Sequence, residues 1–157
     1  MSTITYSQAL EKLKYYCAYQ ERCHQEVKNK LWDFKLSQNE RENIVVELIS
    51  QNYLNEERFA ESYAEGKFRI KKWGRVKIKQ KLKEKQVSDY CIKKGLSAIE
   101  EEEYIETLTQ LIRQKYYNIK DTNLYKKKVK TINYCYQKGY ETDLAWEILN
   151  KEIDSSQ

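Results

Sequence analysis

The sequence predicts an all-α protein made of three tandem three-helix repeats, of the helix-turn-helix type, in an elongated array. The chain has no proline and only four glycines among its 157 residues, so little interrupts a helix. Apolar residues recur at helical spacing in short segments, and a weak sequence signature recurs along the chain. Helices of about two to four turns are marginal alone, so each must pack against its neighbours.

The helix starts are marked by side chains that cap a first turn. The S/T-x-x-E/Q capping box predicts three starts, at Thr5 with Gln8, Ser37 with Glu40, and Ser97 with Glu100. Four further positions fit helix ends: Ser88 and Asp121 as N-caps, Gly74 at a start, and Gly139 after a helix.

Between these marks, apolar stripes at helical spacing predict the core. The stripes are Ala9, Leu10, Leu13 and Cys17; Ile44, Val45, Leu48 and Ile49; Phe59, Ala60, Tyr63 and Ala64; Ile105, Leu108, Ile112 and Tyr116.

The repeat signature places two apolar residues five positions apart, after a basic segment and before a further helix. Its three copies, spaced by 51 and then 53 residues, are Leu31 with Leu36, Leu82 with Val87, and Cys135 with Tyr140. Because each repeat contacts mainly its neighbours, we expect repeats at residues 1–52, 53–100 and 101–157.

Positive charge is concentrated in the middle of the chain. Residues 65–95 carry 12 basic and 3 acidic side chains, a net charge of +9 within a chain of net charge +5. Such a segment is typical of a surface that meets phosphates or an acidic protein face, although a solvated lysine-rich helix is the simpler alternative. The candidate contacts are Lys67, Arg69, Lys71, Lys72, Trp73, Arg75, Lys77, Lys79, Lys81 and Lys83, with a second group at Lys126, Lys127, Lys128 and Lys130.

Trp73 has two interpretations, because a tryptophan in a cationic linker can stack on a base or fill a corner between helices. The four cysteines form no C-x-x-C pair, and Cys23 with His24, the only histidine, falls short of a zinc site. We therefore expect reduced thiols, no metal and no cofactor.

No apolar run approaches the length of a membrane span, which predicts a cytoplasmic protein without a membrane partner.

The run Leu54–Tyr63, followed by Lys71-Lys72-Trp73-Gly74-Arg75, resembles the central signature of the RecX family. The Glu26-Val27 and Lys30-Leu31 segment and the late Lys138-Gly139-Tyr140 extend the resemblance over roughly residues 5–150. It implies three tandem three-helix repeats, with mainly structural roles for the motif residues Glu57, Arg58, Phe59, Ala60 and Gly74. Departures occur at Gln86, where the family favours glycine, and at Cys135, where it favours leucine.

The resemblance also implies a function. RecX proteins bind RecA and its DNA filament and restrain the recombinase, and they can contact DNA directly. We expect this chain to act in the same way, as a monomer with sequence-nonspecific DNA contacts.

The sequence also bears on two other functional classes, an enzyme and a transcription regulator. An enzyme finds no support, because the single histidine and scattered glycines assemble no catalytic constellation, and the acidic run at residues 100–103 suits a helix N-terminus. The serious alternative is a sequence-specific helix-turn-helix transcription regulator. Its recognition helix would favour Arg, Asn and Gln, whereas residues 75–85 are dominated by lysine, which binds phosphates and carries little sequence information.

Overall fold

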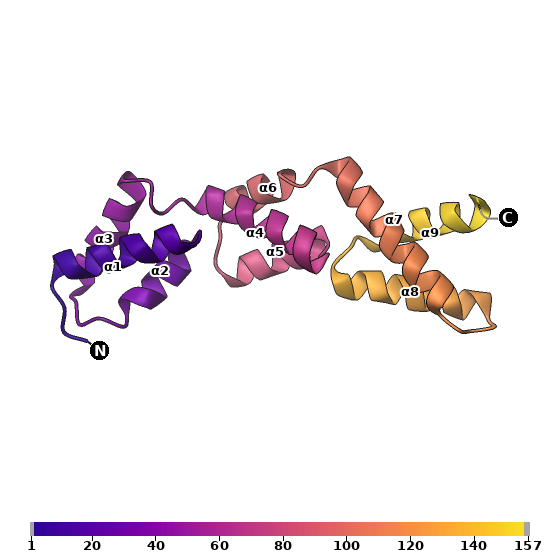
Figure 1. Cartoon of the computed structure of the whole chain (residues 1–157), viewed down its shortest axis with the longest axis horizontal. Coiled ribbons are helices and arrows are strands. Elements are labelled where there is room, and N and C mark those ends of the chain that lie inside the picture. Colours follow the sequence, from indigo (N-terminus) through magenta and orange to yellow (C-terminus); the bar gives the residue numbers. More distant parts are fainter. Residues whose placement is uncertain (1, 156–157) are drawn as a thin grey trace. The chain divides into compact units, whose positions relative to one another are not determined.

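The computed structural model describes residues 2–155, and it confirms the predicted all-α class (Figure 1). Over these residues the helices are α1 (Tyr6–Tyr19), α2 (His24–Leu31), α3 (Gln38–Ser50), α4 (Glu56–Lys71), α5 (Arg75–Glu84), α6 (Asp89–Ser97), α7 (Glu101–Asn118), α8 (Leu124–Lys138) and α9 (Thr142–Ser155). Within the described part of the chain, β-pairing is limited to an isolated parallel bridge between Ser2 and Phe34.

The chain divides into two compact units. The first comprises Met1–Tyr63 with Leu82–Gly95, and the second comprises Ala64–Lys81 with Leu96–Gln157. Because the three boundaries fall within α4, α5 and α6, these helices contribute to both units. The division into three repeats at residues 52 and 100 stays a prediction.

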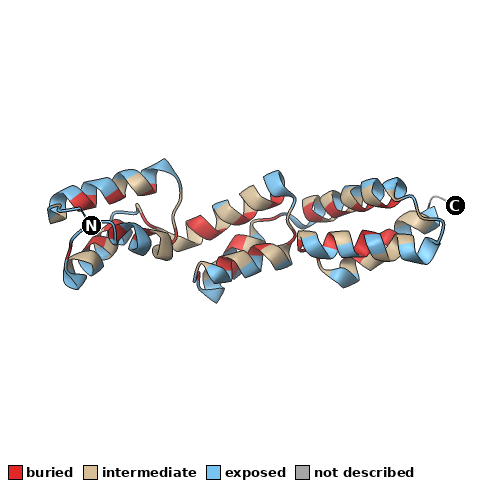
Figure 2. Ribbon diagram, turned by 90° about the horizontal axis from the view of Figure 1, so that it is seen from below, coloured by how far each residue is buried: buried red, intermediate tan, exposed pale blue. Residues whose placement is uncertain are grey.

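The first unit has its main core among α1, α2 and α3. The buried side chains of this cluster include Leu13, Val27, Ile44 and Leu48, all fully enclosed. In the second unit, α7, α8 and α9 bury a comparable set around Leu108, with Tyr104 in place of the expected Ile105. Each helix turns one buried face toward its neighbours and an exposed face outward (Figure 2).

The repeat signature marks the same place in three helix pairs. Leu31, Leu82 and Cys135 lie in α2, α5 and α8, and the residues five positions later lie in the turns that follow. All six side chains are buried. The signature therefore reports a recurring core contact, as expected for a repeat.

The predicted helix ends are confirmed at five sites and wrong at two. One of the five is Gly74, which directly precedes α5 and whose carbonyl accepts from the Ile78 amide at 3.2 Å. The capping boxes at Thr5 and Ser37 are both formed, the Ser88 hydroxyl accepts from the Cys91 amide, and Gly139 ends α8 with a left-handed φ of 95°. Ser97 instead ends α6, and α7 begins after Glu100, because the amide of the buried Ile99 closes a turn on Leu96. Asn123 rather than Asp121 caps α8.

Candidate functional site

The cationic segment forms α5 and the corner that precedes it. Ile78 and Leu82, four residues apart, are fully buried and fix the inner face of α5. The exposed positions therefore fall on the opposite face: Val76, Lys79, Gln80, Lys83 and Glu84. We call this the α5 outer face. Lys77 and Lys81 lie half-buried on its flank, so positive charge spreads around the helix as expected.

The corner between α4 and α5 combines cations with an indole ring. Arg69, Lys71 and Lys72 are exposed, and Arg69 forms an ion pair of 3.6 Å with Glu103. The ammonium groups of Lys67 and Lys77 lie 5.1 and 4.7 Å from the centre of the half-buried Trp73 ring. Trp73 therefore organises two of the predicted site residues through cation–π contacts.

This corner is held against the turn between α8 and α9. The amides of Gly74 and Val76 donate to the carbonyls of Lys138 and Gly139, at 2.8 and 2.9 Å. The Tyr140 hydroxyl donates to the Lys72 carbonyl at 2.9 Å. A Cβ atom on Gly74 would overlap the backbone of Gly139 and Tyr140, so the close approach requires glycine at this position.

Arg75 points into this junction. Its Nε donates to Glu141 at 2.8 Å, its Nη1 donates to Glu101 at 2.7 Å, and its guanidinium lies 3.9 Å from the centre of the Tyr104 ring. The buried Tyr104 hydroxyl accepts from the Arg75 amide and donates to Glu141, and burial, reinforced by Glu141, raises the pKa of this phenol. Arg75 is thus occupied inside the chain, although the sequence suggests an external contact.

The motif residues of α4 lie in the first unit and make contacts within it. Arg58 forms an ion pair of 2.7 Å with Glu21 and donates to the Asn52 carbonyl at 3.1 Å. Phe59 and Ala60 are buried, and Ala60 lies against Gly95 so closely that a Cβ there would overlap it. Glu57 is half-buried near the start of the same helix.

The second predicted group lies on a separate helix, in the first turns of α8. Lys126 and Lys130 are exposed, and Lys130 pairs with Asp121 at 3.0 Å. Lys127 and Lys128 are half-buried, and the Lys127 ammonium group lies 4.4 Å from the centre of the Tyr116 ring. Cations at a helix N-terminus oppose the macrodipole, so their placement here costs stability.

Sequence reasoning missed the acidic and phenolic partners of the junction, Glu101, Tyr104 and Glu141. A signal for Glu141 was available, since it directly follows the third copy of the repeat signature. Tyr104 carried one too, because it lies four residues before Leu108 and therefore on the same face of the predicted helix.

Three of the four cysteines are buried within the described residues. No group of three or more His, Cys, Asp or Glu side chains in this range is arranged to hold a metal ion. The four cysteines are free, and burial raises the pKa of the Cys17, Cys23 and Cys135 thiols to about 11. Such thiols are poor nucleophiles at neutral pH. No helix in the described range is both long and apolar enough to cross a bilayer.

Comparison with known proteins agrees with this architecture. Residues 55–96 match the family model of the second three-helix domain of RecX, and residues 101–149 match that of the third, together more than half of the chain. A regulatory protein RecX of Clostridium acetobutylicum is 32% identical over 138 residues, which are 85% of this chain and 63% of the relative. One of Lactobacillus gasseri is 27% identical over 145 residues, 92% of this chain and 54% of the relative.

Solved structures share the fold at low sequence identity. The crystal structure of RecX from Lactobacillus salivarius gives a TM-score of 0.85 at 22% identity, over 93% of this chain and 95% of that one. A second crystal structure, of a regulatory protein RecX, gives a TM-score of 0.81 at 19% identity, over 93% of this chain and 71% of that one.

The matched relatives are helical regulatory proteins, and none of these matches indicates a catalytic family. The chain belongs to the RecX family. It spans about half to two thirds of the length of the curated relatives it matches.

Proposed function

We propose that this chain binds RecA and the RecA–DNA filament and restrains the recombinase and its ATPase, with sequence-nonspecific contacts to DNA. It does so without a cofactor, as a cytoplasmic monomer. The observation that carries the proposal is the lysine-rich α5 outer face, in a chain whose relatives are named regulatory proteins RecX.

The chemistry of the α5 outer face supports an anionic partner of this kind. Its exposed cations are lysines, which bind phosphate oxygens as point charges. Among the described residues, no ion pair within the chain engages Lys79 or Lys83. Charge that is left exposed attracts an anionic surface over about 8 Å at physiological ionic strength, which orients the encounter before close packing begins.

The first prediction tests this face, together with the exposed Lys72 in the corner before α5, by charge reversal. We expect the triple variant Lys72→Glu, Lys79→Glu, Lys83→Glu to need at least about tenfold more protein for half-maximal suppression of RecA strand exchange and of DNA-dependent ATPase, because repulsion replaces attraction. Arg75 is left unchanged, since its reversal would break the junction with Glu141.

A matched control separates this surface from net charge. Lys28, Lys35 and Lys93 are also exposed, and their triple reversal to glutamate changes the total charge equally. This control should suppress RecA like the parent. If the first variant stays helical by circular dichroism and suppresses RecA as strongly as the parent, the proposed function of the face is wrong.

A further inference from the structure

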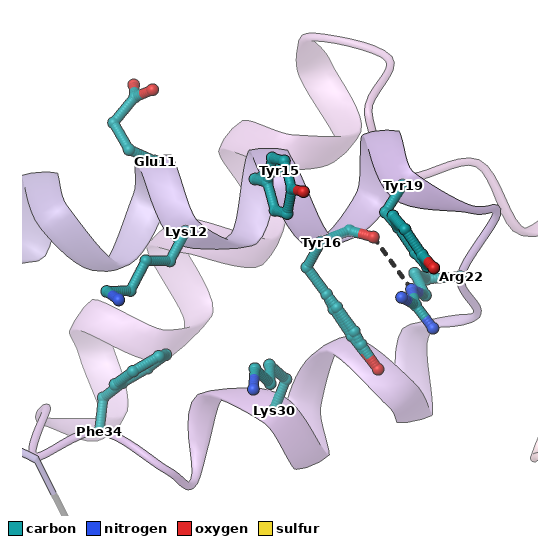
Figure 3. A pocket seen from close by; sticks show the side chains of 8 residues that line it. All are labelled: Glu11, Lys12, Tyr15, Tyr16, Tyr19, Arg22, Lys30 and Phe34. Carbon is teal, nitrogen blue, oxygen red and sulfur yellow. Dashed lines mark hydrogen bonds between the residues drawn. The ribbon is translucent and has the colours of Figure 1, made fainter.

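A hollow of about 740 Å³ lies in the first unit, beside α1 and α2. It is lined by Glu11, Lys12, Tyr15, Tyr16, Tyr19, Arg22, Lys30 and Phe34. Figure 3 shows Lys12 and Tyr16 directed from α1 toward Lys30 and Phe34, with Tyr19 and Arg22 together at the other end. Its volume lies in the range of about 300–1,000 Å³ that is usual for ligand pockets.

The hollow exists because α1 carries two stripes at helical spacing. Ala9, Leu13 and Cys17 lie on the stripe that enters the core. A second stripe on α1 begins at Lys12 and continues through the three tyrosines. Of these, Tyr16 is half-buried and packs against that core, whereas Tyr15 and Tyr19 are exposed. Tyr15 and Tyr19 leave 73% of their surface in solvent, so both rings are accessible to a partner.

Charge in the hollow is predominantly positive. The lining includes three cations, Lys12, Arg22 and Lys30, and one carboxylate, Glu11. Glu11 is itself paired with Lys14 at 3.4 Å. The Arg22 guanidinium stacks 3.6 Å from the centre of the Tyr16 ring and is fixed there by its Nε, which donates to the Tyr16 carbonyl at 3.0 Å. Lys30 has an exposed pair with Asp33 at 3.3 Å, a kind of contact worth little in water.

Exposed aromatic faces interleaved with cations match one partner chemistry closely. Single-stranded nucleic acid offers flat bases for the rings and phosphates for the ammonium and guanidinium groups. A duplex hides the faces of its bases, and acidic side chains carry no aromatic ring that could stack on the two exposed tyrosines.

We propose that this hollow binds single-stranded DNA, with Tyr15 and Tyr19 stacking on bases and Lys12, Arg22 and Lys30 holding the backbone. This would be a second DNA site, made of other residues than the α5 outer face. The inference deepens the proposed function, on which it rests in taking DNA as a partner.

The test compares two oligonucleotides with equal charge. A labelled 15-nucleotide thymidine strand and the same strand without bases present the same phosphates to the parent chain in fluorescence anisotropy. We expect the parent to prefer the strand with bases by about tenfold or more, because stacking requires them. The double variant Tyr15→Ala, Tyr19→Ala should lose this preference, whereas Tyr15→Phe, Tyr19→Phe should keep it.

Two controls make the result specific. Tyr136→Ala removes an equally exposed ring from α8, outside the hollow, and should leave the preference unchanged. Lys79→Glu with Lys83→Glu on α5 should weaken binding of both strands and leave the preference intact. Loss of RecA suppression with this α5 variant therefore reports on the proposed function, and loss of base preference reports on the hollow.

A second measurement locates the contact directly. Light-induced cross-linking to a strand that carries 5-iodouracil should modify the tryptic peptide of residues 15–22, which contains all three tyrosines of the hollow. The proposal is overturned if the abasic strand binds the parent as tightly as the thymidine strand. It is also overturned if the cross-link falls elsewhere, or if a glutamate peptide of equal charge displaces the strand at the same concentration as unlabelled thymidine DNA.

Discussion

At the scale of single residues, basic side chains of the cationic segment serve two different purposes. Lys79 and Lys83 face solvent, whereas Arg75, only four residues before Lys79, is fixed by two carboxylates and a tyrosine ring. A planar guanidinium can satisfy several acceptors at once, which an ammonium group on a flexible stem does less well. Arg75 therefore stabilises the junction that presents the lysines.

The phenol of Tyr104 provides a test of that junction. Tyr104→Phe removes the hydroxyl that accepts from the Arg75 amide and donates to Glu141. We expect the free energy of unfolding to fall by about 1 kcal/mol, because the partly buried Arg75 amide loses its acceptor. Urea denaturation, monitored by circular dichroism, measures this change in the free energy of unfolding.

Tyr116→Phe serves as the matched control. Tyr116 is also buried in α7, but its hydroxyl makes no hydrogen bond within residues 2–155. Removing this hydroxyl should therefore change the free energy of unfolding little. Equal midpoints for the two variants would mean that the Tyr104 hydroxyl contributes nothing net.

At the scale of elements, the turns after the second helix of each repeat differ in backbone conformation. Gly139 adopts a φ of 95°, and Gln86, at the corresponding place before Val87, adopts a φ of 62°. A residue with a Cβ atom is strained in this left-handed region by about 1–2 kcal/mol. Lys35, the counterpart before Leu36, has a negative φ.

These turns predict opposite effects of glycine. Gln86→Gly should stabilise the chain by up to about 1 kcal/mol, since the relief of strain exceeds the added entropy of the unfolded chain. Lys35→Gly should destabilise it by about 0.5–1 kcal/mol, because only the entropic cost remains. Thermal unfolding of both variants measures the two changes in stability. A destabilised Gln86→Gly chain would mean that Gln86 is not strained.

At the scale of the whole molecule, uneven charge governs how the chain meets DNA. The net +9 of residues 65–95 exceeds the charge of the entire chain, so the remainder is net acidic. Binding through such a segment releases counterions and depends steeply on salt.

The slope of the salt dependence counts these contacts. For a 20-base-pair duplex, replacing Lys79 and Lys83 with glutamine should lower the slope of log affinity against log salt by about two, at roughly 0.9 per phosphate contact. Lys28→Gln with Lys35→Gln should leave it unchanged. Both effects should be independent of sequence, whereas preference for one duplex over scrambled competitors by about a thousandfold would favour the transcription regulator.

Much of the fold was predictable because its causes are local. Helical spacing, the absence of proline and the capping boxes at Thr5 and Ser37 are read within a few residues, and the structure bears them out. The box at Ser97 failed because α6 continues through that residue and Ile99 is buried in the turn beyond it. Packing of Ile99 therefore decides whether Ser97 caps a new helix or ends the helix before it.

The sequence by itself determined the helical class, the recurring core signature and the concentration of positive charge in residues 65–95. Tertiary structure alone decided which cations face outward, because Arg75 meets Glu141 across 66 positions of chain, and Arg58 meets Glu21 across 37. It also decided that Tyr15 and Tyr19 line a cationic hollow while Tyr104 is enclosed. A spacing rule reports the face of a helix on which a side chain lies, whereas the partner of that face depends on segments that are distant in sequence.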